Sequence, residues 1–317
     1  MTEAILPRDY YFFGRRLHSP FALASLPLWP ETESEVPPEI VLRFGDTPEA
    51  LPHSVWSSPF IQIGADKSAL VSIAAVARFW IPPASENSSS RVEIVIQPTP
   101  GAEPYEIETF LVGTVAGIVL HRLGMLPLHA SCVEFEGRAI AIAGSAATGK
   151  STLAAALVRR GARLLSDDLC VFHTSNGCIQ TVTGTVQARL WPDVMDHLDI
   201  PLEMRLPTRP GHGKHAVSLP AGEARFWPFH FLLGIEVGFS SPEPMLEPQQ
   251  GLAAFVYLKA MVYQPQIGHV FGDYAREFRA LAAFAQQVSR FSLKRSRYLR
   301  DLDQCVDLIL QLIQRKA

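Results

Sequence analysis

The sequence predicts an α/β protein in which a mostly β lobe at residues 1–104 is followed by an α/β core at residues 105–317 that ends in helices. Three observations predict this arrangement. A complete Gly-x-x-x-x-Gly-Lys-Ser motif occupies residues 144–151, with a short apolar run before it and an Ala- and Leu-rich run after it. Proline-separated, strand-like runs dominate the first lobe. Runs of helical periodicity dominate the end of the chain.

The first lobe contains three strand-like runs, at residues 40–44, 69–81 and 91–96. The polar stretch at residues 82–90 is expected to be a hairpin loop, because strand-like runs flank it closely. A helix is predicted over residues 105–123 and would lead the chain into the core. Its apolar stripe comprises Ile107, Phe110, Leu111, Val115, Ile118 and Val119.

In the core, residues 138–143 suit a buried strand, and residues 152–160 suit a helix that stops at Gly161. A phosphate-binding loop of this type connects a strand to a helix. The predicted strand and helix on either side of residues 144–151 therefore support a phosphate-binding function for the motif. Residues 229–238 suit another strand of the same sheet. Helices are then expected at residues 251–262, 274–290 and 302–316. They would pack on the sheet or form the interface of a homo-oligomer.

The motif at residues 144–151 predicts a phosphate-binding loop. Backbone N–H groups of such a loop face a concavity, and the following helix presents its positive end there. Gly144 and Gly149 are expected to supply backbone angles that a side chain forbids. Lys150 would reach the β- and γ-phosphates, and the Ser151 hydroxyl would coordinate Mg²⁺. The predicted nucleotide-binding residues are Gly144, Ser145, Ala146, Ala147, Thr148, Gly149, Lys150, Ser151 and Thr152.

Two adjacent carboxylates, Asp167 and Asp168, interrupt an apolar run at residues 163–172. Two acids in a hydrophobic run are costly to bury unless they are paired or bound to a metal. At the end of a parallel strand beside the phosphate loop, one acid could complete Mg²⁺ coordination. The other could accept the proton of an attacking hydroxyl. The alternative is a solvent-facing acidic turn.

Residues 128–152 and 160–168 together resemble the catalytic core of HPr kinase/phosphorylase. Both share the order Leu-His, strand, glycine turn, strand, phosphate loop, helix, Arg-Gly-x-Arg-Leu and Asp-Asp. The resemblance implies an α/β fold with a phosphate-loop kinase core that is related to the phosphoenolpyruvate carboxykinases. It also implies transfer of phosphate from ATP, with Mg²⁺, to a serine hydroxyl of a protein.

The same resemblance assigns roles to individual residues. It implies that Asp167 is the general base and that Asp168 is a metal ligand, beside Ser151, or a second acid. It places His129 near the phosphates, where Lys150 also acts. Without the resemblance, His129 is a lone histidine before a strand, and such a residue more often has a structural than a functional role.

The bifunctional enzymes carry a signature near Glu-x-Arg-Gly-Leu-Gly, whereas residues 181–193 read without it. This region is similar instead to the HPr-kinase-like proteins found beside clusters for ribosomally made peptides, including lasso peptides. We therefore expect an ATP-dependent kinase acting on a serine hydroxyl of a peptide or protein, with a precursor peptide as the candidate acceptor. The alternatives are a nucleotide-binding sensor or scaffold without transfer, and a small-molecule kinase.

Basic side chains also occur outside the motif. The loop at residues 205–215 is rich in glycine and proline, and its Arg209 and Lys214 could close over the phosphates as a lid. A solvated surface loop is the alternative. Arg189, which lies beside an aromatic residue, is expected to be fixed against a carboxylate or a phosphate.

The composition is that of an ordinary globular protein of 317 residues. A net charge of −3 gives no electrostatic footprint for nucleic acid. The four cysteines show no Cys-x-x-Cys pair, which suits a reducing compartment. The longest uncharged apolar stretch, at residues 109–120, is too short to span a bilayer. We therefore expect a cytoplasmic protein without a membrane or nucleic-acid partner.

Overall fold

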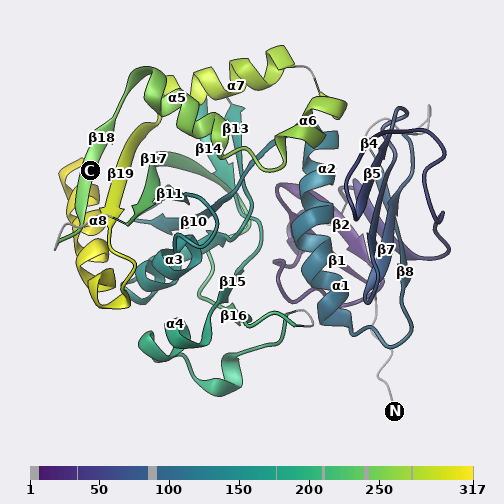
Figure 1. Ribbon diagram of the computed structural model, residues 1–317, viewed down its shortest axis with the longest axis horizontal. Helices are drawn as coiled ribbons and strands as arrows, with labels where there is room; N and C mark the ends of the chain where they lie inside the picture. Colours follow the sequence, from purple (N-terminus) through teal and green to yellow (C-terminus); the bar gives the residue numbers. More distant parts are fainter. Residues whose placement is uncertain are drawn as a thin grey trace.

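The computed structural model describes residues 7–33, 35–84, 91–175, 177–208, 211–238, 243–272 and 274–316. It confirms the α/β class, with an eight-stranded sheet, a nine-stranded sheet and a separate two-stranded hairpin. Figure 1 shows the first sheet on one side of the molecule, a long helix beside it, and the second sheet with its helices on the other side.

The first sheet has the strand order β1-β2-β3-β8-β7-β6-β5-β4. Its strands are β1 (Arg8–Phe12), β2 (Arg15–Ser19), β3 (Ile40–Phe44), β4 (Ser54–Ser57), β5 (Ile61–Gly64), β6 (Ala69–Ile73), β7 (Ala77–Ile81) and β8 (Val92–Pro98). A short 3₁₀ turn, η1 (Glu31–Glu33), lies outside the sheet. The lobe is therefore mostly β, as predicted.

One prediction for this lobe is wrong in detail. The run at residues 69–81 is not one strand, because β6 and β7 pair antiparallel across a tight turn. Folding the run back on itself provides both halves with hydrogen-bond partners. The strands β7 and β8, which flank the polar stretch at residues 82–90, pair antiparallel as expected. Residues 85–90 of that stretch lie outside the described part of the chain.

The predicted helix at residues 105–123 is present as three joined pieces. They are α1 (Pro104–Phe110), the wider π-helical turn η2 (Leu111–Val115) and α2 (Ala116–Arg122). A capping box between Glu103 and Glu106 begins the helix. Single π-turns within helices are frequent at functional sites, and this one faces the site described below.

The second sheet has the order β12-β10-β11-β17-β14-β13-β9, and β19 joins β17 to β18. Its strands are β9 (Leu126–Leu128), β10 (Ala130–Phe135), β11 (Arg138–Ala143), β12 (Arg163–Ser166), β13 (Cys170–Ser175), β14 (Cys178–Val182), β17 (Phe226–Val237), β18 (Met245–Gln249) and β19 (Ser289–Arg295). The hairpin consists of β15 (Gln187–Leu190) and β16 (His215–Ser218). The predicted strand at residues 229–238 is confirmed as most of β17, which runs parallel to β11 and β19.

The strand that leads into the acid pair, β12, is not paired with the strand of the phosphate motif, β11. Strand β10 lies between them and is antiparallel to both. The two outer strands therefore run in the same direction and end at the same edge of the sheet. This edge brings residues 144–151 and the turn at residues 167–169 together.

Helices cover both faces of the second sheet. The helices and 3₁₀ turns of this half are α3 (Lys150–Arg159), α4 (Pro192–His197), η3 (Leu202–Met204), α5 (Gly251–Ala260), α6 (Pro265–Phe271), α7 (Tyr274–Gln287), η4 (Leu299–Asp301) and α8 (Leu302–Lys316). One hydrophobic cluster holds the buried side chains of α3 and α8, and another holds those of α5 and α7.

The predicted helix at residues 274–290 is wrong at its end. Helix α7 stops at Gln287, and Ser289–Arg295 forms the strand β19, with β17 on one side and β18 on the other. Polar and apolar residues alternate in this segment, and two neighbouring strands hold its backbone. The helices at residues 251–262 and 302–316 are confirmed as α5 and α8, within two residues at each end.

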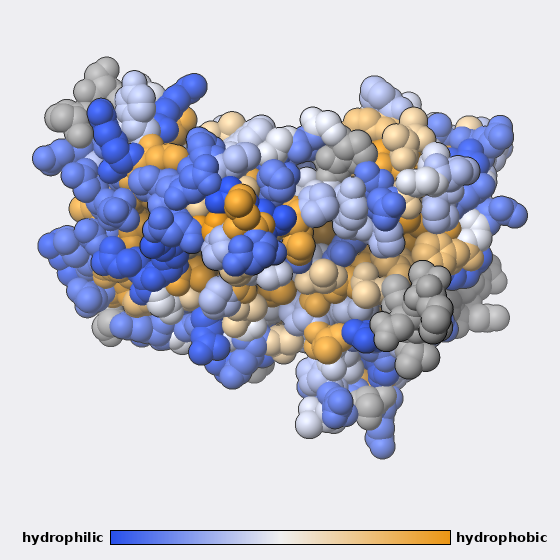
Figure 2. Space-filling view, turned by 90° about the horizontal axis from the view of Figure 1, so that it is seen from below, coloured by the Kyte–Doolittle hydropathy of each residue, from blue (hydrophilic) through white to orange (hydrophobic). Residues whose placement is uncertain are grey.

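The hairpin β15–β16 and helix α4 lie at the bottom of the molecule in Figure 1. Figure 2 shows this lower side face on. Hydrophilic side chains cover most of this face, and apolar side chains show between them in separate patches. Within the described ranges, no helix is long and apolar enough to cross a membrane.

The two lobes share buried contacts. Phe13, fully buried in the turn between β1 and β2, packs against Gly184 of the core. A Cβ atom on Gly184 would come within 2.2 Å of the Phe13 ring, so only glycine fits there. The backbone N–H of Val186 also donates to the Ser25 carbonyl at 2.8 Å. The division at residue 104 stays a prediction about folding units.

We expect Phe13→Ala to lower the free energy of unfolding by about 3–5 kcal/mol, because it empties a filled site between the lobes. Chemical denaturation followed by circular dichroism measures this. Leu252→Ala, at a side chain that is 77% exposed, is the matched control and should change stability little. A loss no larger for Phe13→Ala than for the control would contradict the prediction.

Candidate functional site

The phosphate motif has the local structure that its sequence predicts. Strand β11 ends at Ala143, and α3 begins at Lys150 with Gly149 as its N-terminal cap. Gly149 has a left-handed φ of 93°, as expected for a glycine position. Ala147 also has a left-handed backbone conformation, with a φ of 62°.

Gly144 is required for a different reason from the one predicted. Among the described residues with left-handed φ values, Gly144 does not appear. A Cβ atom at this position would instead lie 2.6 Å from the Thr148 hydroxyl oxygen and 3.2 Å from the Ile235 carbonyl oxygen. Space, rather than backbone angle, excludes a side chain here.

Lys150 lies folded into the loop. Its Nζ donates to the carbonyl oxygens of Gly144 and Ser145 at 3.0 and 3.1 Å. Burial lowers the pKa of Lys150, the charges of Asp168 and Asp167 oppose this, and the charge of Lys214 adds to the lowering. The amine is thus within electrostatic reach of the acid pair.

The first acid, Asp167, is 4% exposed and is held on both of its oxygens. The Ser131 hydroxyl donates to Oδ1 at 2.6 Å, and the backbone N–H of Arg189 donates to Oδ2 at 3.1 Å. The Thr185 hydroxyl bonds to the backbone of Asp167 at both its N–H and its carbonyl. The carboxylate is therefore fixed in direction.

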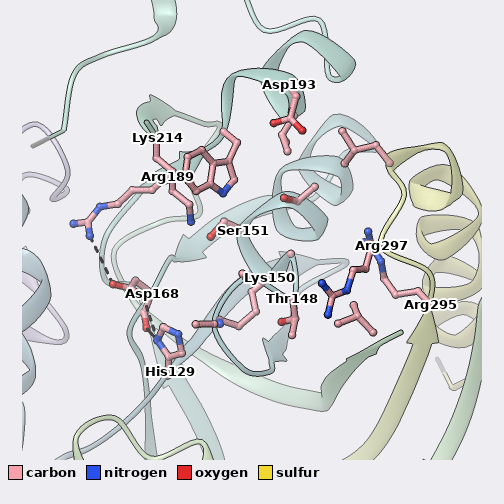
Figure 3. A pocket seen from close by; sticks show the side chains of 18 residues that line it. His129, Thr148, Lys150, Ser151, Asp168, Arg189, Asp193, Lys214, Arg295 and Arg297 are labelled. Carbon is pink, nitrogen blue, oxygen red and sulfur yellow. Dashed lines mark hydrogen bonds and ion pairs between the residues drawn. The ribbon is translucent and has the colours of Figure 1, made fainter. Parts of the chain in front are cut away.

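The second acid, Asp168, occupies the left-handed region with a φ of 71°. Its Oδ1 lies 3.2 Å from His129 Nδ1, and its Oδ2 lies 3.7 Å from Arg189 Nη1 (Figure 3). Burial raises the pKa of Asp168, but the hydrogen bond with His129 and the charges of Arg189, His129 and Lys150 outweigh it. The pKa falls to about 2, so this side chain is ionised at neutral pH.

Arg189 links the acid pair to helix α1. Its Nη2 donates to the Thr109 carbonyl at 3.1 Å, while Nη1 faces Asp168. A Cβ atom on Gly113, in the π-helical turn, would lie 3.8 Å from Nη1, so the turn leaves the guanidinium room. The sequence-based expectation that Arg189 is fixed against a carboxylate is met.

A cavity of about 340 Å³ brings most of the predicted residues together. Its predicted members are His129, Ala146, Ala147, Thr148, Gly149, Lys150, Ser151, Thr152 and Asp168. Gly144 and Ser145 do not line it, but their carbonyls hold Lys150. Lys214 of the basic loop lines it too, whereas Arg209 lies outside the described residues.

The lining of this cavity is cationic although the chain carries a net charge of −3. Two carboxylates, Asp168 and Asp193, face five basic side chains. The basic residues are Lys150, Arg189, Lys214, Arg295 and Arg297. An excess of positive charge beside a helix N-terminus favours a polyanion such as a nucleoside triphosphate.

Two further cavities continue from the first. One of about 260 Å³ is lined by Ser151, Asp168 and Arg189, which also line the first cavity, and adds Asp167 and Tyr263. The other, of about 180 Å³, lies between α1 and the β15–β16 hairpin and is also lined by Asp167 and Arg189. Asp168 therefore lines the cavity of the phosphate loop, whereas Asp167 lines only the two further cavities, one of which it shares with Ser151 and Asp168.

The residues present fit a magnesium ion that is shared with a phosphate. No group of three or more His, Cys, Asp or Glu side chains able to hold a metal occurs in the described ranges. Mg²⁺ in phosphoryl-transfer sites is held by one or two protein oxygens together with phosphate oxygens and water. Ser151 and Asp168 supply such oxygens on one cavity.

Sequence reasoning missed three charged residues of this cavity, namely Arg295, Arg297 and Asp193. Arg295 is the last residue of β19, whose first two residues lie in the segment predicted as a helix, and Arg297 lies two residues beyond the strand. A signal was available, because five basic residues occur between positions 290 and 300. Asp193 is the last residue of the 181–193 region, and its sequence context indicated no role in the site.

No protein-family model matches the chain, and no curated protein matches it in sequence. Among solved structures, it is similar to the Hpr(Ser) kinase/phosphatase from Coxiella burnetii, with 12% sequence identity and a TM-score of 0.31. The similarity covers 60% of this chain and 99% of that chain. The function proposed below therefore rests on the residues of the site.

We expect Ser131→Ala to lower the free energy of unfolding by about 1–3 kcal/mol, because a buried carboxylate loses its hydroxyl donor. Urea denaturation measures this. Ser218→Ala removes a hydroxyl that accepts an exposed hydrogen bond from Gln187, and it is the matched control. Equal effects for the two serines would show that the Asp167 contact contributes nothing to stability.

Proposed function

We propose that this protein is an ATP-dependent kinase that transfers the γ-phosphate to a hydroxyl of a peptide or protein, with serine as the expected acceptor. The observation that carries the proposal is that Lys150 and Ser151 of the phosphate loop line the same cavity as His129 and Asp168. A loop that only bound a nucleotide would not need a pair of adjacent acids beside it.

The proposed roles divide the two acids by the cavities they line. Asp168 and Ser151 hold Mg²⁺, which neutralises charge on the phosphates when it is bound. Asp167 accepts the proton as the acceptor oxygen attacks the γ-phosphorus and the bond to the leaving diphosphate breaks. Ser131 and the Arg189 amide hold the Asp167 carboxylate in one direction for this step.

Basic side chains stabilise the moving phosphoryl group in this proposal. Lys150 turns from the loop carbonyls toward the phosphates, which replace them as acceptors. Arg189 lies between Asp168 and the helix, so it can meet the transferred group from the acceptor side. Lys214, whose Nζ lies 5.8 Å from the Trp191 ring centre, is the lid cation of the basic loop.

The small third cavity supports a peptide acceptor over a metabolite. Its walls are largely apolar and include Val112, Leu206, Pro207 and Ala216. It is lined by Asp167 and has a volume of about 180 Å³, which suits one apolar side chain next to the acceptor serine. A ribosomally made precursor peptide is the acceptor class that we propose.

The first test separates the two acids. Asp167→Asn should lower transfer about a hundredfold or more while leaving ATP affinity within a few-fold, because it faces the acceptor. Asp168→Asn should lower transfer and also the gain in ATP affinity that Mg²⁺ provides. Phosphopeptide mass spectrometry and isothermal titration calorimetry with and without Mg²⁺ measure the two effects. Near-normal turnover in Asp167→Asn would show that it is not the base.

The second test concerns the phosphate loop. Lys150→Ala should weaken ATP binding about tenfold or more and should also abolish transfer, because a charge-assisted contact to phosphate is lost. Lys259→Ala, at an exposed lysine of α5 remote from the site, is the control. ATP binding by the wild type with no phosphorylated product from any peptide encoded near its gene would favour the sensor alternative.

A further inference from the structure

Arg295 is a buried arginine without a compensating carboxylate. The side chain ends β19, and the residue is 4% exposed. Its Nε donates to the Ser296 carbonyl at 2.9 Å, but its Nη1 is buried with no hydrogen-bond partner in the described part of the chain. No ion pair involving Arg295 occurs among these residues.

Such an arrangement is costly for the fold. A buried charge destabilises a protein unless an oppositely charged or hydrogen-bonding partner compensates for its loss of hydration. By comparison, Arg160 and Arg205 lie within 3 Å of Asp307 and Asp196, and the guanidinium of the buried Arg290 lies over the Tyr257 ring. A group kept in an unfavourable setting points to a role outside the fold.

The unpartnered end of Arg295 points to the phosphate loop. Its Nη1 lies 3.7 Å from the position that a Cβ atom would take on Gly149, the residue that caps α3. Arg295 also lines the cationic cavity. Figure 3 shows Arg295 and Arg297 on the opposite side of the loop from Asp168 and His129.

We propose that Arg295 binds a phosphate of the nucleotide and sets the direction in which the nucleotide lies, which rests on the function proposed above. The anion supplies the hydrogen-bond acceptor that Nη1 lacks. If the terminal phosphate lies at Asp168, the remaining phosphates extend across the phosphate loop toward Arg295. The nucleoside then lies beyond it, beside Val237, Arg297 and Leu299, which line that end of the cavity.

The test uses Arg295→Met in the full chain, with ATP and inorganic tripolyphosphate as probes. Calorimetry should give an affinity about tenfold or more lower for both probes, since both carry the phosphate that Arg295 contacts. Thermal unfolding without any probe should give an equal or higher midpoint, because an unpaired buried charge is removed. If Arg295 had only a structural role, the variant would bind both probes with unchanged affinity and would unfold at a lower temperature.

Arg300→Met is the matched control, because this arginine is 78% exposed, lies five residues away and does not line the cavity. It should leave both affinities unchanged. Unchanged binding in Arg295→Met, or a variant that fails to fold, would overturn the proposal. Binding of both probes without any transfer would instead defeat the kinase function and leave Arg295 as an anion-binding residue.

Discussion

Arg189 connects the parts of the molecule that the proposed chemistry needs in one place. Its backbone N–H holds Asp167, its guanidinium faces Asp168, and the same guanidinium donates to Thr109 of the long helix. The π-helical turn at Leu111–Val115 leaves it the room to do so. Without its side chain, Asp168 would lose a neighbouring positive charge, whereas the backbone N–H to Asp167 would remain. The hydrogen bond from the guanidinium to Thr109 of α1 would also be lost.

The charge balance of the principal cavity would suit an anion. The chain as a whole is slightly acidic, yet its principal cavity is lined by more basic than acidic side chains. The negative charge of Asp168 partly offsets the positive charge of the cavity. The surrounding positive charges in turn lower the pKa of Asp168 and keep it ionised. A bound polyphosphate would complete this balance, because it satisfies Lys150 and Arg295 together. Under this proposal, ligand binding would offset part of the cost that the fold bears in burying these cations.

The two acids are neighbours in the sequence but have different surroundings. Asp168 lies in a turn and adopts a left-handed φ. Asp167 is buried against Ser131, whereas Asp168 reaches the phosphate cavity. Two chemically identical side chains can therefore take different parts in one reaction. Such a division needs no difference in residue type, only in what surrounds each group.

Local patterns in the sequence determined the elements whose contacts are also local. The strand, loop and helix around residues 144–151, the helix at residues 105–123 and the acid pair were all readable, because periodicity and motif spacing report on neighbouring residues. Only the tertiary structure decided that β10 separates β12 from β11, and that Ser289–Arg295 is a strand. It alone placed Arg295 beside Gly149. These features depend on pairing and burial between segments far apart in the chain, which no local pattern encodes.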